Sequence, residues 1–261
     1  MIDPPTPPVL PLAPRPGPLQ HEPGSPEYRN AVSAAISAVR GRLDAACAAA
    51  GRDPSGVTLM AVTKFNPLEA VAAAYASGIR CFGESRVQET ERKFPAGFRN
   101  LFPGARLELI GHLQGNKAKA AVGLFDCVQS VDSVRLVEEL GRRADAAGTV
   151  LDLLFELHTG EASKAGFPDE DGLFLALKAA GNFPSLRPRG LMTMAPYTAD
   201  RETIRASFRR CAEAFRRAPL AGAPGWDTIS MGMTNDLELA VGEGSTLVRV
   251  GTAIFGERSQ T

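Results

Sequence analysis

One lysine follows directly on the first strongly apolar run of the chain. Residues 57–63 are Val-Thr-Leu-Met-Ala-Val-Thr, a pattern typical of a buried strand, and Lys64 comes next. Apolar surroundings at the end of such a strand disfavour the ammonium form, so the neutral amine becomes available as a nucleophile. It can then form a Schiff base with an aldehyde. The alternative is a lysine that starts a loop and points to solvent, and position alone favours that alternative.

Two segments near the C-terminus have the composition of a phosphate site. Residues 230–236 precede an expected helix, and residues 249–256 follow the last apolar run. Their small and hydroxyl-bearing residues are Ser230, Gly232, Thr234, Gly251 and Thr252. Glycine permits close approach of a backbone, and the free amides at a helix start favour an anion. An ordinary turn with a helix cap is the alternative. Together with Lys64, the two segments suggest a phosphorylated aldehyde as ligand.

The elements that position these residues alternate between strands and helices. The expected strands are 57–63, 80–83, 107–111, 127–131, 151–157, 187–194, 228–231 and 246–250. The expected helices are 67–77, 86–94, 133–147, 169–180, 201–217 and 236–242, preceded by a long helix that begins after Pro26 and ends at Gly51. Eight strands with helical crossovers favour an α/β fold of the (β/α)8 barrel type, in which functional groups gather where the strands end. The competing open sheet lacks its dinucleotide fingerprint here.

Composition argues against several classes of function. The 261 residues include 29 basic and 29 acidic ones, so zero net charge argues against a general attraction to nucleic acid or to an anionic membrane. No apolar run is long enough to span a membrane, and no secretion signal is found. Four cysteines without a CxxC pair are typical of reduced thiols, which predicts a cytoplasmic protein. The three histidines show no metal-ligand spacing, so no metal site is expected.

The first 26 residues differ in composition from the rest of the chain. They hold ten of the twenty prolines, which lack an amide donor and cannot join a helix or sheet core. We therefore expect a disordered proline-rich tail over residues 1–26 and one barrel domain over residues 27–261.

Six motifs in this sequence resemble the pyridoxal phosphate homeostasis protein family. They are residues 61–64, 82–89, 110–117, 190–195, 230–236 and 248–256, in the order of that family. The resemblance implies a single-domain barrel of the alanine racemase N-terminal-domain type, the type III fold of proteins that bind pyridoxal 5′-phosphate (PLP). It also implies that Lys64 holds PLP as a Schiff base. Ser230, Met233, Thr234, Gly251 and Thr252 would surround the phosphate, and Arg249 would face the pyridine nitrogen.

The resemblance implies a cofactor buffer or carrier in amino-acid and keto-acid balance, with no residue in a catalytic role. PLP-dependent apoenzymes are its candidate partners, whereas no binding to nucleic acid or to membranes is expected. The protein is expected to be a monomer. The alternative is an alanine-racemase-like enzyme. A guanidinium at position 249 only donates, so it cannot keep the ring nitrogen protonated for electron withdrawal. No second catalytic base is expected after the last strand either. An adaptor acting through the tail is a third hypothesis, which the barrel does not support.

Overall fold

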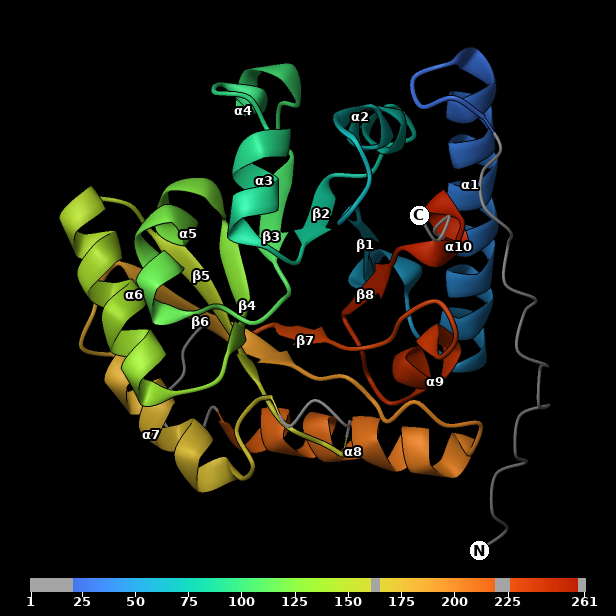
Figure 1. The fold of residues 1–261 in the computed structure, drawn as a ribbon. Helices are drawn as coiled ribbons and strands as arrows, with labels where there is room; N and C mark the ends of the chain where they lie inside the picture. The colour runs from blue at the N-terminus through green and yellow to red at the C-terminus, as the bar shows by residue number, and fades with distance from the viewer. Residues whose placement is uncertain (1–20, 161–164, 219–225, 258–261) are drawn as a thin grey trace, which may run out of the picture.

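The computed structural model describes residues 21–160, 165–218 and 226–257. At its centre, eight parallel strands follow one another in chain order and close into a barrel (Figure 1). They are β1 (Thr58–Val62), β2 (Cys81–Glu84), β3 (Arg106–Leu109), β4 (Cys127–Val131), β5 (Leu151–Glu156), β6 (Leu186–Met192), β7 (Thr228–Ser230) and β8 (Leu247–Val250). The last strand pairs with the first, which places Met60 opposite Arg249. The predicted (β/α)8 barrel is confirmed.

Helices surround the barrel. They are α1 (Pro26–Ala49), α2 (Leu68–Ala76), α3 (Val87–Lys93), α4 (Phe98–Leu101), α5 (Ala118–Leu124), α6 (Val134–Ala147), α7 (Glu170–Ala180), α8 (Arg201–Arg217), α9 (Leu237–Gly242) and α10 (Thr252–Phe255), with short 3-10 turns η1 (Pro54–Gly56) and η2 (Gly115–Lys117). The strand limits differ from the predicted ones by at most two residues, and those of β4 coincide with the prediction. Helix α5 was not predicted, because its seven residues show only a short apolar pattern.

Helix α1 precedes the barrel and stands beside α9 and α10 (Figure 1). Its start is fixed by Ser25, whose hydroxyl accepts a hydrogen bond from the Tyr28 amide at 3.1 Å. On its polar side Arg42 donates to the Thr234 carbonyl and to Glu238, both at 2.8 Å. The helix therefore holds the segment that follows β7 in place.

The predicted tail lies mostly outside the described residues: residues 1–20 are not described, and Pro26 is already the first residue of α1. Within the described ranges, no helix combines the length and the apolar character that crossing a membrane requires.

Candidate functional site

A cavity of about 760 Å³ opens at the C-terminal ends of the strands. Six of the residues predicted from the sequence line it, namely Lys64, Met233, Thr234, Arg249, Gly251 and Thr252. The remaining wall is largely apolar and includes Val62, Ile110, Met192 and Met194. The structure thus brings the Lys64 amine together with a guanidinium and two hydroxyls from the far end of the sequence.

Lys64 is positioned by a buried ionic cluster behind strand β1. Lys93 of α3 donates to the Thr63 carbonyl at 2.7 Å and to Glu84 Oε1 at 2.6 Å. The Thr63 hydroxyl donates to the same carboxylate oxygen at 2.6 Å. Burial raises the pKa of Glu84, and the Lys93 ammonium opposes this only in part. Two neighbouring elements, β2 and α3, therefore fix the peptide that leads into Lys64.

The residue after Lys64 has an unusual backbone conformation. Phe65 has φ of 64°, and it is the only non-glycine residue with positive φ in the described ranges. Its amide donates to Glu89 Oε1 at 2.5 Å. A bulky side chain in this region costs on the order of 1–3 kcal/mol, and such conformations cluster at functional sites. The chain turns sharply at this point, and the Glu89 carboxylate holds the turn.

Arg249 lies on β8 and is only 4% exposed. Its Nη1 donates to Ser230 Oγ at 2.6 Å, and its Nη2 donates to the Thr193 carbonyl at 2.8 Å. Burial lowers the pKa of Arg249 to about 10, against the opposing effect of the nearby Asp236 and Glu156 carboxylates. Arg249 is still a cation at neutral pH, and a guanidinium can donate but not accept hydrogen bonds.

Ser230 is not among the residues that line the cavity. Its side chain is fully buried beneath Arg249, and its hydroxyl donates to Gln129 Oε1 at 2.7 Å. The sequence placed Ser230 beside a phosphate, whereas in the structure its polar contacts are Arg249 and Gln129.

The other hydroxyls and glycines lie where the loops after β7 and β8 meet. The amide of Ala253 donates to Thr234 Oγ1 at 3.3 Å, which joins the two loops. Gly251 precedes α10, whose first amides have no intrahelical acceptor. A Cβ atom added at Gly251 would lie 3.3 Å from the Val62 carbonyl oxygen, so the backbone here is close to β1.

This donor set suits a ligand with an aldehyde, an aromatic ring and a phosphate. Lys64 offers the nucleophilic amine, Thr234 and Thr252 offer hydroxyls for an anion, and Arg249 offers a cationic donor. The apolar wall suits the faces of a planar ring. The residues present therefore fit PLP.

Sequence reasoning missed several residues that support this site. Gln129, Thr193, Glu84 and Lys93 do not line the cavity but bond to residues that do or to their neighbours. The sequence did contain a signal for Gln129, because its amide side chain stands in the middle of an expected strand. Every residue of that strand, β4, is buried in the structure, and a buried amide requires buried hydrogen-bond partners.

Comparison with known proteins shows which family model and which relatives this chain matches. Residues 36–259 match the model of the alanine racemase N-terminal domain. The chain is 41% identical over 224 residues to the pyridoxal phosphate homeostasis protein of Pseudomonas aeruginosa, covering 85% of this chain and 94% of that protein. It is 36% identical over 238 residues to the protein of the same name from Escherichia coli, covering 88% and 97%.

Solved structures that are similar to this chain include one with PLP bound. PipY of Synechococcus elongatus with PLP bound is 35% identical with a TM-score of 0.71, covering 86% of this chain and 100% of that chain. The structure of PipY without PLP is 34% identical with a TM-score of 0.76 at the same coverage. Alanine racemase from Bacillus anthracis has a TM-score of 0.67 at 15% identity, covering 89% of this chain and 57% of that chain, and shares the fold.

Proposed function

Because this chain belongs to the pyridoxal phosphate homeostasis protein family, we propose that it binds PLP and acts as a buffer or carrier of the free cofactor in amino-acid and keto-acid balance. The observation that carries the proposal is the shared cavity, in which Lys64 and Arg249 lie with the hydroxyls of Thr234 and Thr252. A similar protein, PipY, has been solved with PLP bound.

Lys64 is the proposed point of covalent attachment. Its neutral amine attacks the aldehyde carbon, a water molecule leaves, and a Schiff base joins the nitrogen to that carbon. Val62 and Ile110 contribute an apolar wall to the same cavity. The fixed Thr63 carbonyl and the sharp turn at Phe65 support this role, because they limit where the Lys64 side chain can start.

The phosphate and the ring have separate proposed partners. Met233, Thr234, Gly251 and Thr252 lie around the phosphate through hydroxyls, backbone amides and one apolar contact, and Arg249 faces the ring nitrogen. Ser230 contributes to the site through its hydrogen bond with Arg249. The assignment of Ser230 to the phosphate shell has no support from its contacts.

The charge of Arg249 supports a carrier rather than an enzyme. Bound PLP can draw electrons from an attached amino acid, most strongly when its ring nitrogen is protonated. A buried guanidinium beside that nitrogen offers only donors, so it disfavours the protonated ring. The relatives carry the name of homeostasis proteins, which agrees with this proposal.

The same proposal includes three further points: the protein transfers PLP to apoenzymes, it is a monomer, and it is located in the cytoplasm. All four cysteines are buried and unpaired, which supports a reducing compartment.

Borohydride trapping tests the attachment site. Purified protein is mixed with PLP, the visible absorbance band is recorded, and reduction is followed by peptide mapping. We expect a pyridoxyl phosphate mass on the peptide that contains Lys64. The Lys64→Ala variant should lose the visible band and remain folded, since a residue at the cavity contributes little packing. Labelling of a different lysine in the wild-type protein would contradict the assignment.

A further inference from the structure

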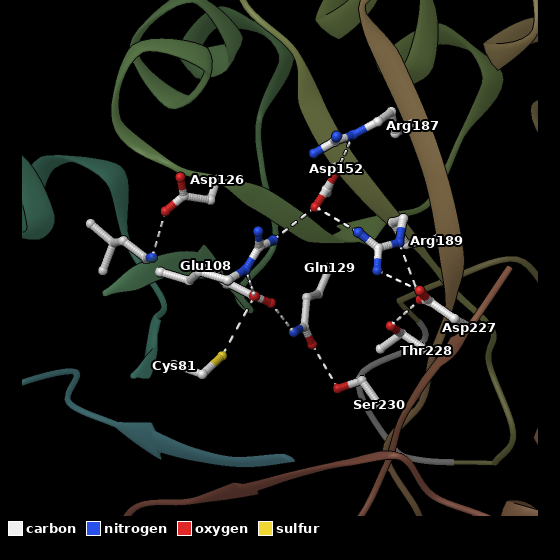
Figure 2. A network of polar contacts seen from close by, with 12 residues as sticks. Cys81, Glu108, Asp126, Gln129, Asp152, Arg187, Arg189, Asp227, Thr228 and Ser230 are labelled. Atoms are coloured by element: carbon white, nitrogen blue, oxygen red, sulfur yellow. Dashed lines mark hydrogen bonds and ion pairs between the residues drawn. The ribbon is translucent and has the colours of Figure 1, made fainter. Parts of the chain in front are cut away.

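A continuous chain of hydrogen bonds runs through the barrel interior below Arg249. Arg249 Nη1 donates to Ser230 Oγ at 2.6 Å, and Ser230 donates to Gln129 Oε1 at 2.7 Å. Gln129 Nε2 donates to Glu108 Oε2 at 2.6 Å. Figure 2 shows the three lower members, Ser230, Gln129 and Glu108, end to end. We refer to the four residues as the interior relay.

The two ends of the interior relay dictate its direction. A guanidinium has only donors, so Ser230 must accept from Arg249 and has one proton left to give. A carboxylate has only acceptors, so the NH2 group of Gln129 must face Glu108 and its carbonyl must face Ser230. Serine and glutamine satisfy both requirements because each is both donor and acceptor. All four side chains are at least nine-tenths buried, so water does not substitute for these contacts.

The lower end of the interior relay is anchored in a wider ionic network. Arg106 Nε donates to Glu108 Oε1 at 3.2 Å, and its Nη2 donates to Asp152 at 2.8 Å. Asp152 also accepts from Arg187 at 2.7 Å and from Arg189 at 3.3 Å (Figure 2). Glu108 is therefore held in place at the opposite mouth of the barrel and gives the relay a fixed negative end.

In the part of the chain that the structure describes, the upper end has no comparable ionic network, and the Asp236 and Glu156 carboxylates act on Arg249 only from a distance. Within the described residues Arg249 forms no direct ion pair, and its side chain donates to the hydroxyl of Ser230 and to the Thr193 carbonyl. A buried cation needs oriented acceptors to keep both its charge and its direction. The Thr193 carbonyl is one such acceptor, and the Ser230 hydroxyl, which is bonded in turn to Gln129 and through it to Glu108, is the other.

We propose that Gln129 is a positioning residue of the PLP site: through Ser230 it couples Glu108 to Arg249 and fixes the guanidinium against the ring nitrogen of the cofactor. This inference rests on the proposed function, and it gives Gln129 a role although it lies outside the cavity. An apolar residue at position 129 would leave the Ser230 proton without its acceptor and Glu108 without one of its donors.

Three variants test the coupling. Gln129→Met keeps the length of the side chain and removes both hydrogen bonds. Ser230→Ala cuts the same relay one step higher with a smaller change in volume, and the third variant carries both changes. Leu154→Met is the matched control, because it keeps an apolar side chain in the buried cluster of Leu154, Cys127 and Met192 and removes no hydrogen bond. Folding is checked by far-UV circular dichroism and thermal unfolding.

The readouts are the Kd of PLP from titration of the visible band and the circular dichroism of that band, which reports how the bound ring is oriented. We expect each single variant to raise Kd about tenfold, near the lower end for a hydrogen bond to a charged group. The visible dichroism should fall in both, and the double variant should bind no more weakly than the weaker single variant. Leu154→Met should match the wild-type protein.

Other outcomes separate the two proposals. Wild-type protein that binds no PLP would overturn the proposed function. Wild-type protein that binds PLP, with a folded Gln129→Met variant of unchanged Kd and unchanged visible dichroism, would overturn the role of Gln129 alone. An effect of Ser230→Ala without one of Gln129→Met, or strictly additive effects, would show that Ser230 acts independently and would also overturn the coupling. If Gln129→Met does not fold, a Ser230→Ala variant with wild-type binding would refute the interior relay.

Discussion

Replacing Lys93 with methionine tests whether the ionic cluster behind Lys64 holds the site together. The Lys93 and Glu84 side chains are 7% and 0% exposed, so the variant leaves a carboxylate buried without its cation. Loss of one partner of such a pair costs about 3–5 kcal/mol of unfolding free energy. The bond from Lys93 to the Thr63 carbonyl is lost as well. We expect PLP to bind more weakly in addition, because Thr63 leads directly into Lys64.

The loss of stability in Lys93→Met depends on pH. Burial already raises the pKa of Glu84 above its ordinary value of 4.5. Without the Lys93 ammonium, which opposes this shift, the folded-state pKa rises further. An acid with a folded-state pKa above its unfolded value loses stability as pH rises through the interval between the two values. The variant should therefore be least destabilised at about pH 4.5 and below, and most destabilised above the raised pKa of Glu84.

Urea unfolding at about pH 5 and at pH 7.5, relative to wild type, measures both effects. Glu84→Gln in the Lys93→Met background removes the unpaired charge and should recover about 2 kcal/mol or more at pH 7.5. Arg142→Met is the matched control, because the Arg142–Glu139 pair is exposed and its loss should cost at most about 1 kcal/mol. A cost below about 1 kcal/mol for Lys93→Met, or one that Glu84→Gln does not relieve, would refute this reasoning.

Two further predictions concern the cofactor itself. PLP should bind more tightly than pyridoxal, because the hydroxyls and amides around Thr234 and Thr252 meet a dianion. Gly251→Val should weaken PLP binding, because its Cβ would lie 3.3 Å from the Val62 carbonyl oxygen. Equal affinity for PLP and pyridoxal in a calorimetric titration would contradict this assignment. A chiral assay across the common amino acids, with Lys64→Ala as blank, should show no racemisation at or above about 1 s⁻¹, the low end of ordinary enzymes, and faster turnover would favour the enzyme.

The strand order and the places of Lys64 and Gly251 at strand ends were predictable because both follow from local patterns, whereas Met233 and Arg249 were named as site residues only through the family resemblance. Short apolar runs separated by helical spacing gave the barrel, and the rule that chemistry gathers at strand ends led to Lys64 and to Gly251. The confirmed barrel then places both at one mouth. Helix α5 was missed, because a segment of seven residues has too few apolar positions to show a helical period.

The depth at which the Ser230 side chain lies below the cavity was not predictable in the same way. The rule of strand ends identifies the correct mouth but not which layer of side chains a residue occupies. Ser230 pairs with Leu247 of β8, two residues before Arg249, so the long Arg249 side chain lies above it. Contacts such as that between Gln129 and Ser230 join residues 101 positions apart, and only the closed barrel brings them together.

The barrel interior is divided by polarity, and the division matches the two chemical tasks proposed for its mouth. Met60, Val62, Cys81 and Leu247 form an apolar cluster on the side of β1, β2 and β8, and Lys64 follows on from it. This cluster meets the polar residues where the Cys81 thiol donates to Glu108 at 3.5 Å. Glu108, Gln129 and Ser230 form a polar line from β3 through β4 to β7, and Arg249 ends it. Apolar surroundings favour a neutral amine, whereas oriented dipoles keep a guanidinium charged. A ligand with an aldehyde at one edge and a ring nitrogen at another requires both environments side by side, which a uniformly apolar barrel would not supply.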